Sequence, residues 1–386
     1  KVAPSPLDSG VLIVVGATTG QAGSADANAG GTDIYMQRRD VATGQLLAAK
    51  LLGSGGNEDV GAVYVDEAEG QLVILATTDG EVGTRVGGVD LLLVVADLQT
   101  LEIVYQKQFG TTADDVPADV GKVADTYVAV GTGREQQTFA NQPNALLLFA
   151  VSAKTLKDER FVVDAEESLD IFFGIYSVLF NTPAAGVFIG AEMTDLAAAP
   201  NVSVLQKPQS FYLLRYELAS LQRRNRQELV YFQGVDRRPL APVSMTASTQ
   251  AIYIGGETPG FQNPYLPSQY NPNVGVFPMV ALTLLGLGES DINVETWNRV
   301  SFSNTSSNPQ VSFVNNTVVY SRTYNTTNRD RTTFEYNTFA NTLRGQERYE
   351  LDHGNHDLFI EKAVSIIEGD GAVTNVLVGR SVATED

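Results

Sequence analysis

The sequence contains no cysteine among its 386 residues, and it has only two histidines and one tryptophan. The lack of cysteine excludes a disulfide framework, a thiolate metal site and a cysteine nucleophile. Only two histidines could act as the base of a Ser-His-Asp triad. The sequence contains neither a G-x-S-x-G nucleophile elbow nor a Walker loop. Enzyme activity is therefore the less favoured hypothesis, although paired carboxylates for glycoside hydrolysis stay open as an alternative.

Positive charge is also scarce, because 26 Lys and Arg stand against 45 Asp and Glu, for a formal net charge of -19. Such a balance disfavours nucleic acids and anionic membranes, which bind proteins largely through Lys and Arg. The longest apolar runs, Val11–Gly16 and Leu91–Ala96, are too short to span a bilayer. We therefore expect no nucleic-acid partner and no direct membrane insertion of this chain.

Residues that favour strands and turns, namely Val, Thr, Tyr, Phe and 35 Gly, are spread along the whole chain. An apolar strand that ends in small residues recurs about every 55 to 66 residues. The seven copies begin at Val11, Leu72, Tyr127, Val187, Ile252, Val318 and Val376. This repetition predicts an all-β protein built from one recurring unit.

Three further strands complete each unit. Every copy except the last is followed by a polar loop and a second apolar strand, such as Asp90–Asp97. A more polar third strand follows, as at Leu101–Gly110 and Glu228–Gly234, and a fourth precedes the next copy, as at Gly61–Asp66. Four short antiparallel strands cannot bury both faces of their sheet alone, so the units are expected to stack radially as propeller blades.

The second and third units carry a family resemblance. The segments GSGGNEDVGAVYVDEAEGQLVILATTDG from Gly53 and GGVDLLLVVADLQTLEIVYQKQFG from Gly87 resemble the bacterial-type β-propeller repeat of the SBBP family. Its pattern runs roughly G-G-S-x-D-D, an apolar strand ending in Asp, G-N-x-Y-V-x-G and then G-x-D-A-F-V. The resemblance implies a propeller, with seven blades as the family expectation, and it implies no particular activity.

The blades are expected to form a single propeller domain over residues 1–386, with seven four-stranded blades. Seven copies of the inner strand pair require a degenerate first strand within Lys1–Leu7, whereas the outer pair appears only six times. The last blade is therefore predicted to be incomplete in this chain. Closure with six blades is the alternative.

Acidic residues recur just before the predicted innermost strands, at Glu58 and Asp59, at Asp114 and Asp115, and at single positions further on, Asp170 and Asp357. Turns rich in carboxylates could hold Ca²⁺, which takes six to eight oxygen ligands, so Asp59 and Asp115 are metal candidates. Their spacing matches neither EF-hand nor nonapeptide calcium patterns. Structural turns whose carboxylates accept backbone N–H bonds are the simpler interpretation.

The two histidines lie together between Asp352 and Asp357, where other units have their blade-connecting turn. His353, His356 and Asp357 could supply imidazole and carboxylate ligands to a metal ion. An exposed polar turn is the alternative, since no separated further ligand can be named. No cofactor is expected, with Ca²⁺ as the one ion kept open.

The longest variable loop, Glu257–Gly275, carries Phe261, Tyr265 and Tyr270 as candidates for contact with a partner. A second loop, Glu192–Ser210, lies on the same side of the repeat. Such aromatic side chains also fold back over their own blade in propellers, which is the alternative.

One basic cluster, Arg223–Arg226, is predicted as a turn between the second and third strands of the fourth unit. It could dock an acidic partner, or it could be an ordinary solvated turn. Four N-x-[ST] sequons are candidate glycosylation sites in a secreted eukaryotic chain: Asn201, Asn304, Asn315 and Asn325. Their number is what this composition would produce by chance, so it is no evidence of secretion.

The repeat, the acidic balance and the lack of catalytic motifs together favour a binding or scaffolding propeller. We expect it to be extracellular or on the cell surface, where it mediates protein or glycan contacts in an adhesive assembly. The loops between the two long strands of each unit are the expected contact surface. A glycan-active propeller enzyme that uses carboxylates around a central channel is the alternative.

Overall fold

A computed structural model describes the chain over its strands and most of the connections in its first third. The described residues are 2–4, 10–134, 145–165, 171–180, 186–195, 210–233, 236–239, 241–247, 251–257, 276–283, 293–301, 306–314, 317–324, 331–337, 342–349, 356–367 and 373–383. They form strands, turns and bends, and none of them is helical. Within these ranges, no helix long and apolar enough to cross a membrane occurs.

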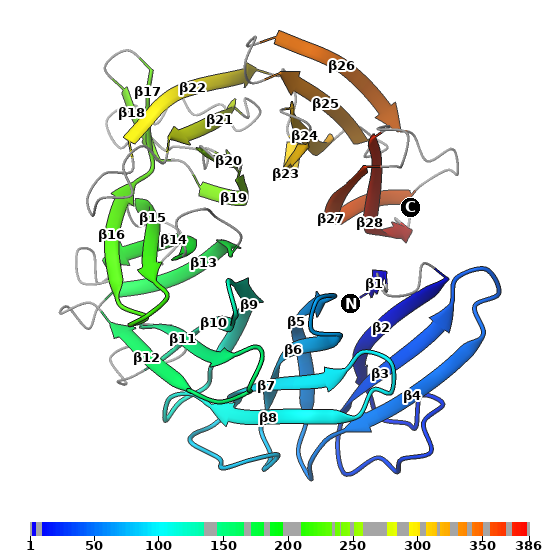
Figure 1. Cartoon of the computed structure of the whole chain (residues 1–386). Helices are drawn as coiled ribbons and strands as arrows, with labels where there is room; N and C mark the ends of the chain where they lie inside the picture. The colour runs from blue at the N-terminus through cyan, green and yellow to red at the C-terminus, as the bar shows by residue number, and fades with distance from the viewer. Residues whose placement is uncertain are drawn as a thin grey trace. The chain divides into compact units, whose positions relative to one another are not determined.

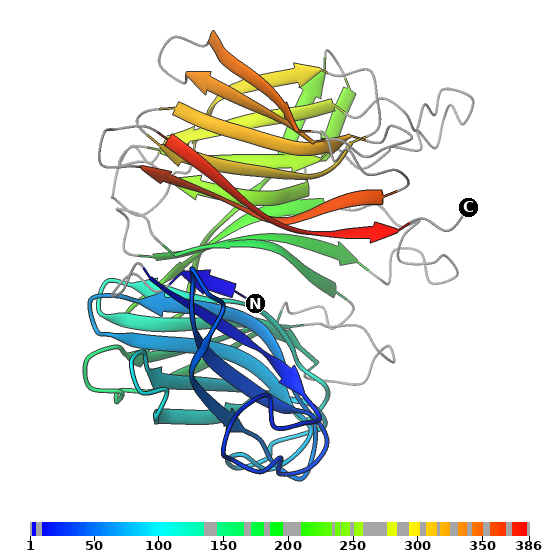
Figure 2. The ribbon, with the colours of Figure 1, turned by 90° about the vertical axis from the view of Figure 1, so that its right-hand side faces the viewer.

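Six of the described sheets have four antiparallel strands paired in chain order (Figure 1). The first contains β1 (Val2–Pro4), β2 (Val11–Thr18), β3 (Asp33–Asp40) and β4 (Leu46–Leu52), which run antiparallel (Figure 2). The second contains β5 (Glu58–Asp66), β6 (Gln71–Thr78), β7 (Asp90–Asp97) and β8 (Ile103–Phe109). The third contains β9 (Val116–Val123), β10 (Thr126–Gly133), β11 (Ala145–Ser152) and β12 (Arg160–Ala165).

The remaining sheets follow the same order along the chain. The fourth contains β13 (Ile171–Leu179), β14 (Gly186–Asp195), β15 (Ser210–Glu217) and β16 (Arg223–Glu228), and is followed by the hairpin of β17 (Val230–Gln233) and β18 (Asp236–Pro239). The fifth contains β19 (Ala241–Ala247), β20 (Ala251–Glu257), β21 (Val276–Thr283) and β22 (Asn293–Ser301). The sixth contains β23 (Ser306–Val314), β24 (Thr317–Tyr324), β25 (Arg331–Asn337) and β26 (Thr342–Tyr349). Finally, β27 (His356–Ile367) pairs with β28 (Val373–Ala383).

The predicted repeat is confirmed at the level of strands. Each of the seven predicted copies lies in a second strand: β2, β6, β10, β14, β20, β24 and β28. The degenerate first strand expected near the start of the chain is β1, which pairs with β2 through Val2 and Val14. The all-β class and the four-stranded sheets are therefore confirmed, whereas the number of blades and their closure stay predictions.

The outer strand of the fourth sheet corrects the sequence prediction. Arg223–Glu228, of which the first four residues were expected to form a turn, is the outer strand β16 itself. The segment expected as that outer strand contains β17, which pairs with β18 in a separate hairpin. An outer strand has one face and one edge available to water, so it tolerates a run of polar side chains that lacks the apolar signal of a buried strand.

The second sheet explains the unbroken apolar runs in the sequence. All side chains from Leu91 to Ala96 in β7 are fully buried. Leu92 belongs to a core cluster with Ile13 of the first sheet, while Leu93 belongs to a second cluster with Phe149 of the third sheet. Successive side chains of a strand point to opposite faces, so a sheet packed on both sides needs an apolar residue at every position of its central strands.

The chain divides into two compact units. The first comprises Lys1–Ile175, Met193–Pro208 and Tyr216–Arg223, and the second comprises Tyr176–Glu192, Gln209–Arg215 and Arg224–Asp386. Within the first unit, β5 contacts both β2 and β9. Within the second unit, β23 contacts both β19 and β27. The first strands β5 and β9 are thus neighbours, as are β19, β23 and β27, in the manner of propeller blades, while β5 contacts the first sheet through its second strand, β2.

A buried polar cluster joins the second and third sheets. Lys122 Nζ of β9 lies 2.6 Å from Asp66 Oδ2 at the end of β5. The Tyr127 hydroxyl donates to the same oxygen and approaches Gln71 Oε1, both at 2.8 Å. Burial raises the pKa of Asp66, but the hydrogen bonds from Lys122 and Tyr127 outweigh this effect and leave the pKa below its usual value. The cluster therefore holds a charged carboxylate between two sheets.

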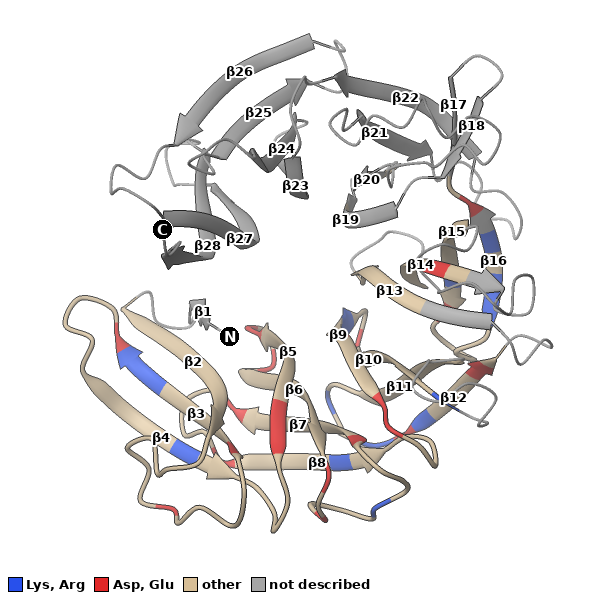
Figure 3. Cartoon of the chain, turned by 180° about the vertical axis from the view of Figure 1, so that it is seen from behind, with Lys and Arg blue, Asp and Glu red and all other residues tan. Residues whose placement is uncertain are grey.

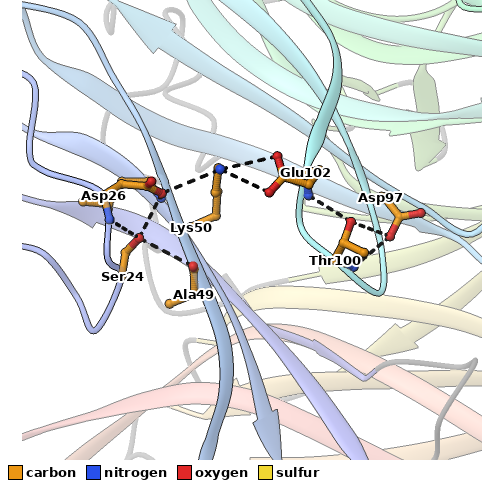
Figure 4. Close-up of polar contacts among 8 residues, drawn as sticks. Ser24, Asp26, Ala49, Lys50, Asp97, Thr100 and Glu102 are labelled. Carbon is orange, nitrogen blue, oxygen red and sulfur yellow. Dashed lines mark hydrogen bonds and ion pairs between the residues drawn. The ribbon is translucent and has the colours of Figure 1, made fainter.

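Cations on the outer strands form a second set of links between sheets. Each of these cations contacts the turn between the last two strands of the next sheet. Lys50 also lies 3.9 Å from Asp26, in a loop of its own sheet (Figure 4). The pairs are Lys50 with Glu102, Lys107 with Glu159, and Arg160 with the backbone carbonyls of Leu218 and Ala219. Since several of these side chains are well exposed, each ion pair is expected to contribute at most about 1 kcal/mol.

The buried cluster can be tested by changing Tyr127 to Phe. The change removes the hydroxyl that donates to Asp66, and we expect the free energy of unfolding to fall by about 1–3 kcal/mol, measured by urea denaturation. Tyr64→Phe is the matched control, because Tyr64 packs against the same core and its hydroxyl makes no hydrogen bond to the described residues. Equal losses in the two variants would contradict a special role for the Tyr127 hydroxyl.

Candidate functional site

Two long loops and two turns of the first unit form one continuous surface, which we call the loop face. Its loops are residues 19–32, between β2 and β3, and residues 79–89, between β6 and β7. Its turns are residues 53–57, before β5, and residues 110–114, before β9. Hydrogen bonds join these segments, including the ones that connect backbone groups of Gly31 with Gly56 and Asp79 with Asn57.

Each turn folds around a buried carboxylate at the start of the next sheet. Ser54 donates its backbone N–H to Glu58 Oε2 at 2.9 Å and its hydroxyl to Oε1 at 2.6 Å. One repeat later, Thr111 donates in the same way to Asp115, at 2.9 Å and 2.8 Å. A buried carboxylate without donors would cost several kcal/mol, so the hydroxyl residue and the acid four positions later act as one structural pair.

The same turns are tied to the loops by a repeated backbone contact. Thr32 N–H donates to Asn57 Oδ1 at 3.2 Å, and Val89 N–H donates to Asp114 Oδ1 at 3.0 Å. In return, the backbone N–H of the buried acid donates to the carbonyl of Thr32 or Val89, at 2.7 Å in both repeats. The last residue of each loop is therefore held on both sides.

A second buried acid, the first residue of β3 or β7, anchors the base of each loop. Ala29 N–H donates to Asp33 Oδ2, and Val86 N–H donates to Asp90 Oδ2, both at 2.7 Å. Both carboxylates are fully buried. Each loop thus folds over the start of its own strand.

The two anchors differ in how fully they are satisfied. Asp90 also accepts from Gly87 N at 2.9 Å and from Gln108 Nε2 at 2.8 Å. Asp33 Oδ1 has no hydrogen-bond partner among the described residues. Gln108 pairs with the third residue of β7 on the neighbouring strand. At the equivalent position of the first sheet, the residue paired with the third residue of β3 is Leu51, which has no side-chain donor. The first loop therefore rests on a less complete hydrogen-bond network than the second.

Glycine is required where loop and turn approach each other. A Cβ on Gly30 would collide with the carbonyl oxygen of Ser54, and one on Gly87 would collide with that of Thr111. Backbone atoms cannot move aside as a flexible side chain can. Both loops end in the sequence G-G-x-D. Its first glycine allows the close backbone contact, and its aspartate is the buried anchor.

The electrostatics of the loop face are dominated by carboxylates, and several of its segments are red in Figure 3. Burial raises the pKa of Asp115 to about 6, and the negative charges of Asp90 and Asp114 add to the rise, although the hydrogen bonds from Thr111 oppose it. At the surface, hydrogen bonds from Asn57 lower the pKa of Asp79. The face thus combines a partly exposed acid whose pKa is lowered with a buried acid whose pKa is raised.

The two metal candidates of the first unit, Asp59 and Asp115, have different surroundings. Asp59 is exposed on β5, which begins at Glu58 and so takes in both acids that were expected before the strand. Among the described residues, no group of three or more His, Cys, Asp or Glu is placed to hold a metal ion. Asp115 instead has the structural-turn role that the sequence favoured. Ca²⁺ binding stays a prediction.

The remaining candidates lie partly or wholly outside the described residues. His356 and Asp357 are the first two residues of β27 and not part of a turn, because the strand starts earlier than its apolar residues indicate. The following candidates fall outside the described residues: Asp170, His353, Phe261, Tyr265, Tyr270, Asn201, Asn304, Asn315 and Asn325.

Sequence reasoning misses the two loop anchors and their hydroxyl counterparts. In the sequence, Asp33 and Asp90 only bound apolar strands, and Ser54 and Thr111 carry no recognised motif. The signal that could have found them is the internal repetition of G-G-x-D and of G-[ST]-x-x-[ND]-[ED] in consecutive units. A residue type that recurs at the same position of consecutive units indicates that its side chain makes the same bond to the backbone in each unit.

Comparison with known proteins supports the fold alone. No family model and no curated protein matches the sequence. Two structures of the plexin A4 full extracellular region are similar, each with a TM-score of 0.52 and 7% identity, over 87% and 92% of this chain. The chain spans only 44% and 38% of those plexin chains. The WD40 domain of SCAP from fission yeast aligns with a TM-score of 0.42 at 8% identity, over 91% of this chain and 80% of that one. The plexin likeness supports a β-propeller fold.

The raised pKa of Asp115 predicts a pH-dependent stability. The folded state takes up this proton near pH 6, whereas an unfolded Asp does so near 3.8, so protonation stabilises the fold as pH falls from 7 to 4. We expect this gain to be on the order of 2 kcal/mol relative to Asp115→Asn, which cannot take up the proton. The free energy of unfolding of both proteins is measured in urea across this pH range. The other acids titrate in both proteins, so their contributions cancel in the difference between the two free energies. Parallel stability profiles would refute the assignment.

The importance of a fully satisfied anchor can be tested at Gln108. Gln108→Leu leaves Asp90 Oδ2 without the side-chain donor and also removes the bonds to Gly80 O and Gly83 N. We expect a loss of about 2–4 kcal/mol in the free energy of unfolding and faster hydrogen exchange in residues 79–89. Gln106→Leu, two positions earlier on the same face of β8 but exposed, is the control; it removes only the bond to Val82 O and should cost less than about 1 kcal/mol. The prediction is wrong if the control costs as much.

Proposed function

We propose that the chain is a β-propeller binding module that recognises a protein or glycan partner through its loop face. The observation that carries this proposal is the repeated anchoring of the loops. Asp33 and Asp90 hold the loop bases, and Glu58 and Asp115 hold the turns beside them. Binding surfaces of this kind place variable, exposed loop residues on a rigid scaffold, which limits the entropy lost on binding.

The middle parts of both loops are available for contact. Gln21 and Ala25 are exposed in the first loop, and Glu81 and Thr84 are exposed in the second. The two loops differ in length and sequence, while the turns beneath them repeat the same pattern. The repeat thus preserves the support and varies the part that a partner would touch.

The proposal extends to the whole chain as one extracellular or cell-surface propeller of seven blades, acting in an adhesive or scaffolding assembly. The similarity to extracellular regions of plexin A4 supports this location and this fold. Neither catalysis nor a cofactor is needed for such a role.

A glycan-active enzyme is the second candidate, and one observation favours it. Asp115 and Asp90 are neighbouring acids, and the pKa of Asp115 is raised, as in the acid–base pairs of glycosidases. Both oxygens of Asp115, however, accept hydrogen bonds from Thr111, and the residue is buried. A catalytic acid must reach its substrate, so a structural role suits this residue better.

The test compares two double variants on glycan and extracellular-protein arrays and on a panel of glycosidic substrates. Gln21→Ala with Glu81→Ala removes contacts of the loop face, and we expect binding of any captured ligand to weaken about tenfold. Glu67→Ala with Gln99→Ala makes the same chemical changes on exposed residues of turns at the other end of the strands, and should leave binding intact. Equal effects would refute recognition by the loop face. Turnover of a substrate that Asp115→Asn abolishes would establish the enzyme instead.

A further inference from the structure

A local concentration of arginine interrupts the acidic surface of this protein. The chain has 26 Lys and Arg in 386 residues, yet β16 and the following hairpin contain five of them. They are Arg223, Arg224, Arg226, Arg237 and Arg238. The segment also includes Glu228 and Asp236, so its local balance is positive in a chain with a net charge of -19.

The strand β16 presents two of these arginines to solvent. It is the last strand in the order of its sheet, and it is blue in Figure 3 along much of its length. Arg224 and Arg226 alternate with less exposed residues and are both exposed, so they share one face. Arg223 belongs to the other face, where its Nε lies 3.4 Å from Asp164 Oδ2. The guanidinium carbon of Arg226 lies 5.2 Å from the ring centroid of Tyr212, a contact that orders the side chain.

The hairpin places two further arginines close to the end of β16. Leu229 continues the pairing of β16, because its N–H donates to the carbonyl of Phe211 at 2.7 Å. The next residue begins β17, whose Tyr231 and Phe232 lie opposite Arg238 and Arg237 of β18. At about 3.3 Å per residue, the backbone positions of these arginines lie within roughly 20 Å of Arg226 along the strand path.

We propose that Arg224 and Arg226, which share one exposed face of β16, form a docking surface for an extended acidic segment of a partner protein. We call this surface the arginine strip; it is separate from the loop face. Arginines two positions apart on a strand match acidic residues two positions apart on an extended peptide. Guanidinium groups bind carboxylates through paired hydrogen bonds, which lysine cannot form.

The charge distribution favours a short acidic peptide over a nucleic acid. Exposed charges more than about 10 Å apart are largely screened in 0.1 M salt, so a peptide that spans the strip interacts mainly with its arginines. A long nucleic acid would extend across the rest of a protein with a net charge of -19 and would be repelled there. A peptide of about six residues, close to 20 Å long when extended, is long enough to contact both arginines of the strip.

The experiment measures fluorescence anisotropy of a labelled peptide with Glu and Thr in alternation, binding to the whole chain. A peptide with Gln in place of Glu is the neutral probe. We expect saturable, salt-sensitive binding of the acidic peptide only, weakened about tenfold or more by Arg224→Gln with Arg226→Gln. Circular dichroism checks folding, and the single variant Arg224→Gln replaces the double variant if that one unfolds.

A matched control separates the strip from general charge effects. Lys154→Gln with Lys157→Gln removes two positive charges from the exposed end of another sheet and should change the affinity less than about twofold. An equal loss in this control, equal binding of the neutral peptide, or no saturable binding would each overturn the proposal. Tight binding of heparin or single-stranded DNA that depends on Arg224 and Arg226, without peptide binding, would replace it with a polyanion site.

Discussion

Carboxylates buried at the ends of strands hold the loops and turns of the first three sheets. A buried, ionised carboxylate is costly unless donors surround it, and here the donors are backbone N–H groups and hydroxyls of the adjoining turn. Glu58 and Asp115 thus shape the turns, while Asp33 and Asp90 shape the loops. The same bonds position the loops for recognition, so stability and the proposed function share one set of interactions.

The same bonds account for the residues that recur at corresponding positions of consecutive units. The second and third sheets keep glycine, hydroxyl and acid at corresponding positions, since each takes part in the repeated hydrogen bonds. In the first sheet, Leu51 lies where the second sheet has Gln108, and Asp33 Oδ1 is buried without a hydrogen-bond partner among the described residues.

The structure shows that the charged residues of this acidic protein are unevenly distributed over its surface. Net charge alone argues against nucleic acid and membrane partners, yet it hides the segregation of charge between the loop face and β16. Because salt screens exposed charges beyond about 10 Å, a partner interacts with the local surface more than with the total. A loop face rich in carboxylates and a separate strip of arginines suit a protein with more than one contact in an assembly.

The amino-acid order alone dictates the all-β class and the seven second strands, because strand periodicity and repeated turn residues depend on local geometry. The sequence did not identify Arg223–Glu228 as a strand, and it placed His356 in a turn and not at the start of β27. Arg223–Glu228 and the first residues of β27 are polar and lack the alternating apolar residues by which a strand is recognised. The packed fold was needed to establish that Asp33 and Asp90 anchor the loops and that Arg224 and Arg226 share an exposed face. Those roles arise from packing between segments distant in sequence, and no local pattern encodes which neighbour a buried or exposed side chain will meet.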